Sequence, residues 1–142
     1  MKFTLEVIPR TKKNSSQMIM FKGKPRLIPS KYYKQFEQEC LMQIKNEYKM
    51  QINTPVNVKA IFYMPTKRRV DLTNLLSALC DMLVKANIVS DDNRDVIAKH
   101  DGSMVLYDKE RPRIEIEIEK LEGYEQWKKV WFIKLKIKIM RW

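Results

Sequence analysis

The sequence has little of the residues that would identify a disulfide-rich or a zinc-binding protein. Its 142 residues include three glycines, two cysteines and one histidine. Cys40 and Cys80 lack CxxC spacing and have only His100 as a further ligand, so neither a disulfide framework nor a Cys/His zinc site is expected. Both cysteines lie on the apolar faces of predicted helices, and we interpret them as small core residues.

The sequence also lacks a long apolar run. No stretch approaches the roughly 20 residues that cross a bilayer, and the N-terminus MKFTLEVIPR has no signal-peptide core. We therefore expect a cytoplasmic protein without a membrane partner. The chain is 44% hydrophobic and contains few glycines and prolines, so it can build a core. Its length suits one folded domain.

Charge is unevenly distributed along the chain. Lysine and arginine total 28 against 17 acidic residues, a formal charge of +11, which favours a polyanionic partner such as nucleic acid. Within this basic protein, residues 71–108 carry seven aspartates. They are Asp71, Asp81, Asp91, Asp92, Asp95, Asp101 and Asp108. Aspartate is common in turns and helix caps, so spacing alone leaves a structural and a functional explanation open.

Hydrophobic periodicity predicts a mixed α/β (α+β) domain, a small mixed β-sheet with two packed helices. The predicted elements are a strand over 3–7, a hairpin or flap around 22–25, a helix from the N-cap Ser30 to about Met50, a strand over 55–64, a helix from Asp71 to Asn87, and strands over 96–99 and 113–121. We assign residues 1–120 to this domain. Residues 121–142 form a basic extension, predicted to be a strand because apolar residues and lysines alternate in it.

Two acidic segments flank the second predicted helix. Asp71 follows the basic loop with Arg68 and Arg69, and the pair Asp91-Asp92 follows the helix. A helix of about 16 residues is about 24 Å long, so its ends cannot converge by themselves. If the chain turned back along the helix, two carboxylates would meet beside basic groups, as a Mg²⁺-dependent nuclease requires. Alternatively, Asp71 is an N-cap and Asp91-Asp92-Asn93 a turn.

The segment from residue 68 to residue 92 resembles a known signature. The pattern consists of Arg68-Arg69-x-Asp71-Leu72-x-Asn74-Leu75, Ala78-Leu79-x-Asp81-x-Leu83 and Ala86-Asn87-Ile88-Val89-x-Asp91-Asp92. It is similar to that of the RusA family of Holliday junction endonucleases, known from bacteria and their phages. The similarity extends over most of residues 1–120, including the closing strand Pro112-Arg113-Ile114-Glu115-Ile116.

The resemblance implies a homodimeric endonuclease of DNA recombination and repair. Such an enzyme nicks a four-way DNA junction symmetrically through water activated by Mg²⁺, with Mn²⁺ as a possible substitute. The acidic site residues of the family correspond to Asp71 and Asp92, with Asp91 and Asp81 as candidate helpers and Thr73 at the motif's second acidic position. Ser77 stands where the motif of the family has a lysine. The candidate DNA-binding residues are Lys12, Lys13, Asn14, Lys31, Arg68, Arg69 and Asn74.

The departures at Thr73 and Ser77 keep a second hypothesis open. A hydroxyl is a weaker ligand than a carboxylate, so the chain could instead be a catalytically impaired, structure-selective DNA-binding protein of the same fold. Lys85 or Lys99 could supply the missing positive charge. A third hypothesis is a basic RNA-associated protein.

Overall fold

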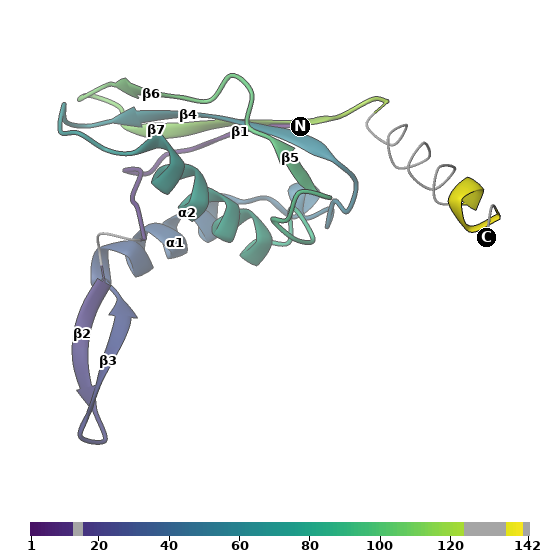
Figure 1. Cartoon of the computed structure of the whole chain (residues 1–142). Helices are drawn as coiled ribbons and strands as arrows, with labels where there is room; N and C mark the ends of the chain where they lie inside the picture. Colours follow the sequence, from purple (N-terminus) through teal and green to yellow (C-terminus); the bar gives the residue numbers. More distant parts are fainter. Residues whose placement is uncertain (13–15, 124–135, 141–142) are drawn as a thin grey trace.

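The computed structural model of the protein describes residues 1–12, 16–123 and 136–140. Its main sheet is mixed, as predicted (Figure 1). The central strand β4 (Val56–Met64) pairs antiparallel with β7 (Arg113–Lys120), which pairs antiparallel with β1 (Lys2–Leu5). On its other edge, β4 pairs in parallel with two short strands in succession, β5 (Ile97–Lys99) and β6 (Met104–Tyr107).

Two helices cover one face of this sheet, α1 (Lys31–Gln43) and α2 (Leu72–Lys85), as Figure 1 shows. Alternate residues of β4 and β7 point toward them, and Phe62 and Ile114 are almost fully buried. The apolar residues of α2 recur at helical spacing, and Leu75, Leu79 and Leu83 bury the helix against this layer. The predicted sheet with two packed helices is therefore confirmed.

The predicted flap is a two-stranded hairpin outside the main sheet, formed by β2 (Ser16–Phe21) and β3 (Lys24–Pro29). Lys22 and Gly23 connect the strands, both with positive φ, at 50° and 73°. This conformation suits a two-residue hairpin loop, because its twist matches that of the strands. In Figure 1 the hairpin extends away from the sheet and the helices.

The first helix is shorter than predicted. Ser30 caps it as expected, its hydroxyl accepting the N–H of Tyr33 at 3.2 Å, but the helix ends at Gln43 instead of Met50. Ile44 is extended and buried, and a short 3-10 turn, η1 (Asn46–Tyr48), follows. Tyr48 stacks on Phe3 with ring centroids 5.0 Å apart. Apolar residues keep helical spacing beyond Gln43, but packing against the sheet ends the helix there.

Strand β6 was not predicted, because Met104 to Tyr107 are all apolar and show no alternation. They lie at an edge of the sheet, where Met104, Leu106 and Tyr107 stay exposed. In the C-terminal extension, residues 136–140 are helical, instead of the strand predicted there. A helix closes its hydrogen bonds locally, whereas a strand needs a neighbouring strand. Residues 124–135 and 141–142 of the extension lie outside the described residues. Among the described helices, none is long and apolar enough to cross a membrane.

Candidate active site

Asp71 stands at the N-terminus of α2, directly after the loop that leaves the central strand. Its backbone is extended, and its carbonyl accepts the N–H groups of Asn74 and Leu75 at 3.1 and 3.2 Å. Its carboxylate makes no cap hydrogen bond to the helix backbone. The backbone of Asp71 therefore begins the helix, while its exposed side chain does not perform the capping role that the structural alternative assigned to it.

Asn74 holds the Asp71 carboxylate instead. Its side-chain amide donates a hydrogen bond of 3.1 Å to Oδ2 of Asp71. Asn74 is half-buried, so this contact fixes the carboxylate on the first turn of α2. Thr73 and Ser77 are exposed on the same N-terminal part of the helix. Asn74, predicted to bind DNA, thus has a positioning contact with Asp71.

Asp91 forms a local turn after α2. One oxygen of its carboxylate accepts the N–H of Asp92 at 2.7 Å, and the other accepts the side-chain amide of Asn93 at 3.0 Å. Asn93 in turn accepts the N–H of Asp95 at 2.9 Å. Both carboxylate oxygens of Asp91 therefore stabilise the loop, as the turn interpretation predicted for this residue.

Asp92 lies in the segment that follows α2. The chain reverses at Asn87, which has a φ of 60°, and then buries Ile88 and Val89. Burial, followed by the nearby carboxylates of Asp92 and Asp81, raises the pKa of the Cys80 thiol to about 12. Cys80 is therefore protonated at neutral pH and is not an activated nucleophile. Its sulfur lies 3.7 Å from Nε2 of His100.

The described residues contain no ready-made metal cluster. Asp71 begins α2, and the carboxylate of Asp92 lies close enough to act on Cys80, nine residues further along the helix. Within residues 1–12, 16–123 and 136–140, no group of three or more acidic, histidine or cysteine side chains could hold a metal. The convergence of Asp71 and Asp92 stays a prediction.

The oxygen donors present nevertheless suit a hard cation. Mg²⁺ is usually bound through one or two carboxylates, with water and substrate phosphate oxygens as the other ligands. Asp71 offers an exposed carboxylate that is already oriented by Asn74, and the hydroxyl of Thr73 is also exposed. Asp92 offers a second exposed carboxylate. The chemistry of this donor set fits magnesium.

The candidate phosphate ligands have different surroundings. Lys31, Arg68 and Arg69 are exposed. Lys12 lies 3.7 Å from the Asp81 carboxylate, and its ammonium is 5.9 Å from the centre of the Tyr33 ring. Lys13 and Asn14 lie outside the described residues. Neither proposed substitute for the motif's lysine is unpaired, since Lys85 pairs with Glu37 and Lys99 lies 3.8 Å from Asp101.

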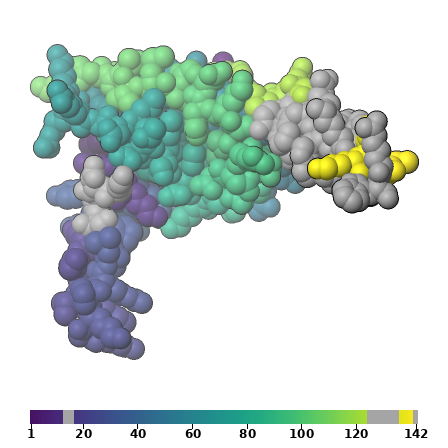
Figure 2. Space-filling model, viewed as in Figure 1, coloured from purple at the N-terminus to yellow at the C-terminus, as the bar shows by residue number. Residues whose placement is uncertain are grey.

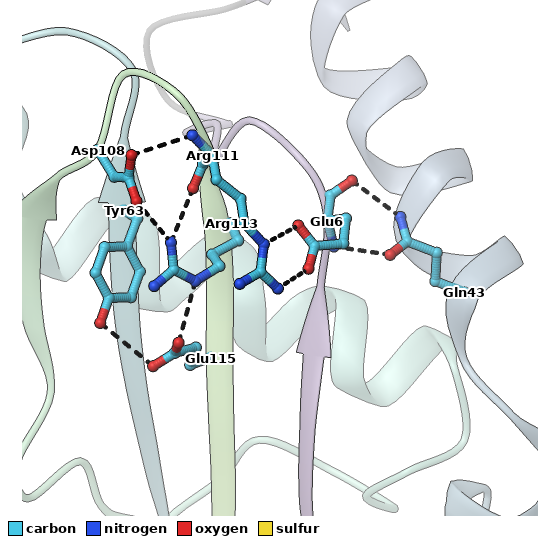
Figure 3. Close-up of polar contacts among 7 residues, drawn as sticks. All are labelled: Glu6, Gln43, Tyr63, Asp108, Arg111, Arg113 and Glu115. Carbon is cyan, nitrogen blue, oxygen red and sulfur yellow. Dashed lines mark hydrogen bonds and ion pairs between the residues drawn. The ribbon is translucent and has the colours of Figure 1, made fainter.

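A polar network joins the strand ends from which the loop to Asp71 starts (Figure 3). The guanidinium of Arg113 lies 3.6 Å from the ring centre of Tyr63, and it donates to Asp108 at 2.9 Å and to Glu115 at 3.1 Å. Asp108 also donates its N–H to the carbonyl of Met64, the last residue of β4. The network thereby fixes the end of β4 beside β6 and β7.

Comparison with known protein families places most of the chain in one of them. Residues 6–119 of the 142 match the family described as Endodeoxyribonuclease RusA. The chain belongs to the RusA family. No curated protein matches it. The resemblance predicted from the segment around α2 is thereby confirmed, and with it the membership of a family of endodeoxyribonucleases that act on branched DNA.

This RusA family member carries its candidate acidic residues on the matched part of the chain. The match includes the hairpin, α2 and the Asp91-Asp92 turn, and it ends at Glu119, one residue before the end of β7. Sequence reasoning missed the network around Arg113, since its members come from β4, from β7 and from the loop between β6 and β7. The one available signal was the position of Arg113 in an alternating strand, where it shares a face with three glutamates.

Proposed function

We propose that the chain is a Mg²⁺-dependent endonuclease that resolves four-way DNA junctions by paired symmetric nicks. The observation that carries the proposal is the RusA family match over residues 6–119. The exposed, oriented carboxylate of Asp71, two residues after the exposed Arg68-Arg69 pair, supports it. Mg²⁺ would polarise the scissile phosphodiester and lower the pKa of the attacking water.

The residues of the chain would then have distinct tasks. Asp71 and Asp92 hold the metal, and Asn74 keeps the Asp71 carboxylate in place. Lys12, Lys31, Arg68 and Arg69 bind DNA phosphates, and we extend this role to Lys13 and Asn14 of the same basic loop. Asp91 organises the turn that presents Asp92. Each phosphate contact by a cation should make junction binding more dependent on salt.

Because no group of three or more ligand-type side chains gathers within the described residues, we propose that a homodimer completes the metal site. Asp71 of one copy and Asp92 of the other would then serve one active site. Mixing Asp71→Asn and Asp92→Asn proteins tests this arrangement, since a mixed dimer would contain one intact site and one doubly altered site. We expect the mixture to nick one strand of the junction, whereas either variant alone does not. An inactive mixture, with subunit exchange verified by differently sized tags, would contradict a shared site.

Activity itself is tested on a synthetic four-way junction. We expect wild-type protein to cleave it with Mg²⁺ or Mn²⁺ and to lose cleavage in EDTA. Asp71→Asn should abolish cleavage and retain binding. Glu122→Gln is the control, since it makes the same carboxylate-to-amide change at an exposed residue outside the matched residues 6–119. Undiminished cleavage by Asp71→Asn would exclude Asp71 as a metal ligand.

The second candidate function is favoured by Thr73 and Ser77. It is a structure-selective DNA-binding protein that has lost cleavage through these two substitutions in the motif. Junction binding without cleavage in either metal would support it. In that case Thr73→Asp with Ser77→Lys should gain cleavage, because the pair restores a carboxylate and an ammonium to the N-terminal part of α2. Competition by structured RNA at fixed salt would test the RNA-associated alternative.

A further inference from the structure

The β2–β3 hairpin is a prominent arm that no function assigned so far explains. Figure 2 shows it standing clear of the body of the molecule, where the helices and the main sheet do not cover it. A two-stranded hairpin in water is only marginally stable without a packing partner. The exposed hydrophobic side chains of this arm therefore require an explanation.

The register of the arm sorts its side chains onto two faces. Residues directly opposite each other in an antiparallel pair share a face. Met18 pairs with Leu27, and Met20 pairs with Pro25, so these four residues form one uncharged face, which we call the apolar face. Met18 is 72% exposed, and Met20 and Leu27 are each 69% exposed. Such a face is unusual for side chains of this size unless it binds something.

The other face and the turn of the arm carry its charges. Ile19 pairs with Arg26, and Phe21 pairs with Lys24. The guanidinium of Arg26 lies 4.8 Å from the centre of the Phe21 ring, and the ammonium of Lys22 lies 5.5 Å from it. Residues 16–29 contain these three cations and no carboxylate. The arm is therefore apolar on one side and positively charged on the other and at its end.

This distribution favours DNA over a second copy of the chain as the partner. Two arms packed through their apolar faces would bring six positive charges close together, whereas a polyanion would neutralise them. A two-stranded ribbon fits the major groove, and methionine, leucine and proline are among the side chains that proteins insert between base steps. The basic loop with Lys12 leads into the arm, and Lys31 lies two residues after its end, so the arm continues the proposed phosphate-binding surface.

We propose that the β2–β3 arm enters the junction at its branch point and places its apolar face against unstacked bases, while Lys22, Lys24 and Arg26 bind the flanking phosphates. The inference rests on the proposed function for the identity of the DNA. A branch point exposes base-pair faces where helices meet, whereas a continuous duplex has to be unstacked at a cost of a few kcal/mol per step. The arm thus selects junctions over duplexes.

The variant Met18→Thr with Met20→Thr tests the apolar face, because threonine keeps strand propensity while removing most of the hydrophobic contact. Met42→Gln is the matched control, since Met42 is 86% exposed on α1. The readout is fluorescence of 2-aminopurine beside the branch point, measured in EDTA so that it does not depend on cleavage. We expect wild type and control to raise the fluorescence, and the double variant to lose this rise and about tenfold in junction affinity, with duplex affinity unchanged.

The cations of the arm give a second readout. A triple variant should bind the junction with less dependence on salt. The magnitude of the slope of log binding constant against log salt concentration should fall by about 3, at nearly one unit per phosphate contact. The triple variant carries Lys22→Gln, Lys24→Gln and Arg26→Gln. An unchanged fluorescence rise in the double methionine variant would overturn the proposal. It would also be overturned if that variant converted a dimer into a monomer in sedimentation, since the apolar face would then bind a second copy. Absence of cleavage by wild type contradicts the proposed function but leaves these binding readouts valid.

Discussion

The two helices begin at residues of cap type, and only one of these residues uses its side chain as a cap. The Ser30 hydroxyl accepts the Tyr33 N–H at 3.2 Å in a site that is 4% exposed, whereas the Asp71 carboxylate makes no such bond. Removal of a working cap costs about 0.5–2 kcal/mol. We expect Ser30→Ala to lower the free energy of unfolding by about 1–2 kcal/mol, because the buried Tyr33 N–H loses its acceptor. Asp71→Ala should lower it by about 0.5 kcal/mol or less, as at an ordinary surface position.

Urea and thermal unfolding measure this difference. Both measurements are made in about 0.3 M salt. The Debye length is then about 6 Å, which limits the attraction between the Asp71 charge and the helix dipole. For a domain of this size, 1 kcal/mol corresponds to a shift in Tm of about 4 °C, so the two variants are readily separated. A loss in Asp71→Ala as large as that in Ser30→Ala would refute the reasoning. Asp71 would then be a structural cap, and its availability as a metal ligand would lose support.

Three further predictions concern the fold around the site. Because Asn87 has a φ of 60°, Asn87→Val should lower the free energy of unfolding by about 1–2 kcal/mol in urea, and Asn87→Gly should not. Arg111 lowers the pKa of Glu6 below 4.5 through side-chain hydrogen bonds, and backbone and side-chain hydrogen bonds from Arg111 and Arg113 lower that of Asp108 below 3.8. The ionised Glu6 and Asp108 carboxylates stabilise the fold fully at a pH above their ordinary pKa values, and this stabilisation is lost as the pH falls through their lowered pKa values. Arg111→Gln should therefore make Tm fall less steeply in acid, and an unchanged profile of Tm against pH would contradict this prediction. Burial raises the pKa of Cys40 and Cys80 to about 12, so a disulfide reagent at mildly basic pH should label both thiols only after unfolding.

The main elements were predictable because local periodicity and burial agree in them. Strand β4 and helix α2 follow their predicted limits closely, since Val58, Ala60 and Phe62 alternate and the leucines of α2 recur at helical spacing. The hairpin loop was predictable from Gly23, which tolerates positive φ. The end of α1 was not, because the burial of Ile44 in an extended conformation depends on tertiary packing.

The surroundings of the candidate site residues were only partly predictable. Sequence indicated the family, which the match over residues 6–119 confirms, while the roles of Asp71 and Asp92 stay predictions. It could not show that the Asn74 amide holds the Asp71 carboxylate, because an aspartate at this position commonly caps the helix backbone instead. It also could not show that Asp92 comes near Cys80, because that depends on the path of the chain after Asn87. The exposed apolar face of the arm could not be predicted either. In the sequence Met18 and Met20 resemble ordinary strand residues, and only their cross-strand partners show which face they share.

The most direct test of the account is to map the products formed from a four-way junction by wild type and by Asp71→Asn at equal bound fractions. We predict that wild type with Mg²⁺ nicks two opposing strands at symmetric positions, and that Asp71→Asn binds the junction with similar affinity and leaves it intact. Equal cleavage by both proteins, or a wild type that binds the junction without cutting it in Mg²⁺ or Mn²⁺, would contradict the proposed metal-dependent resolution of junctions.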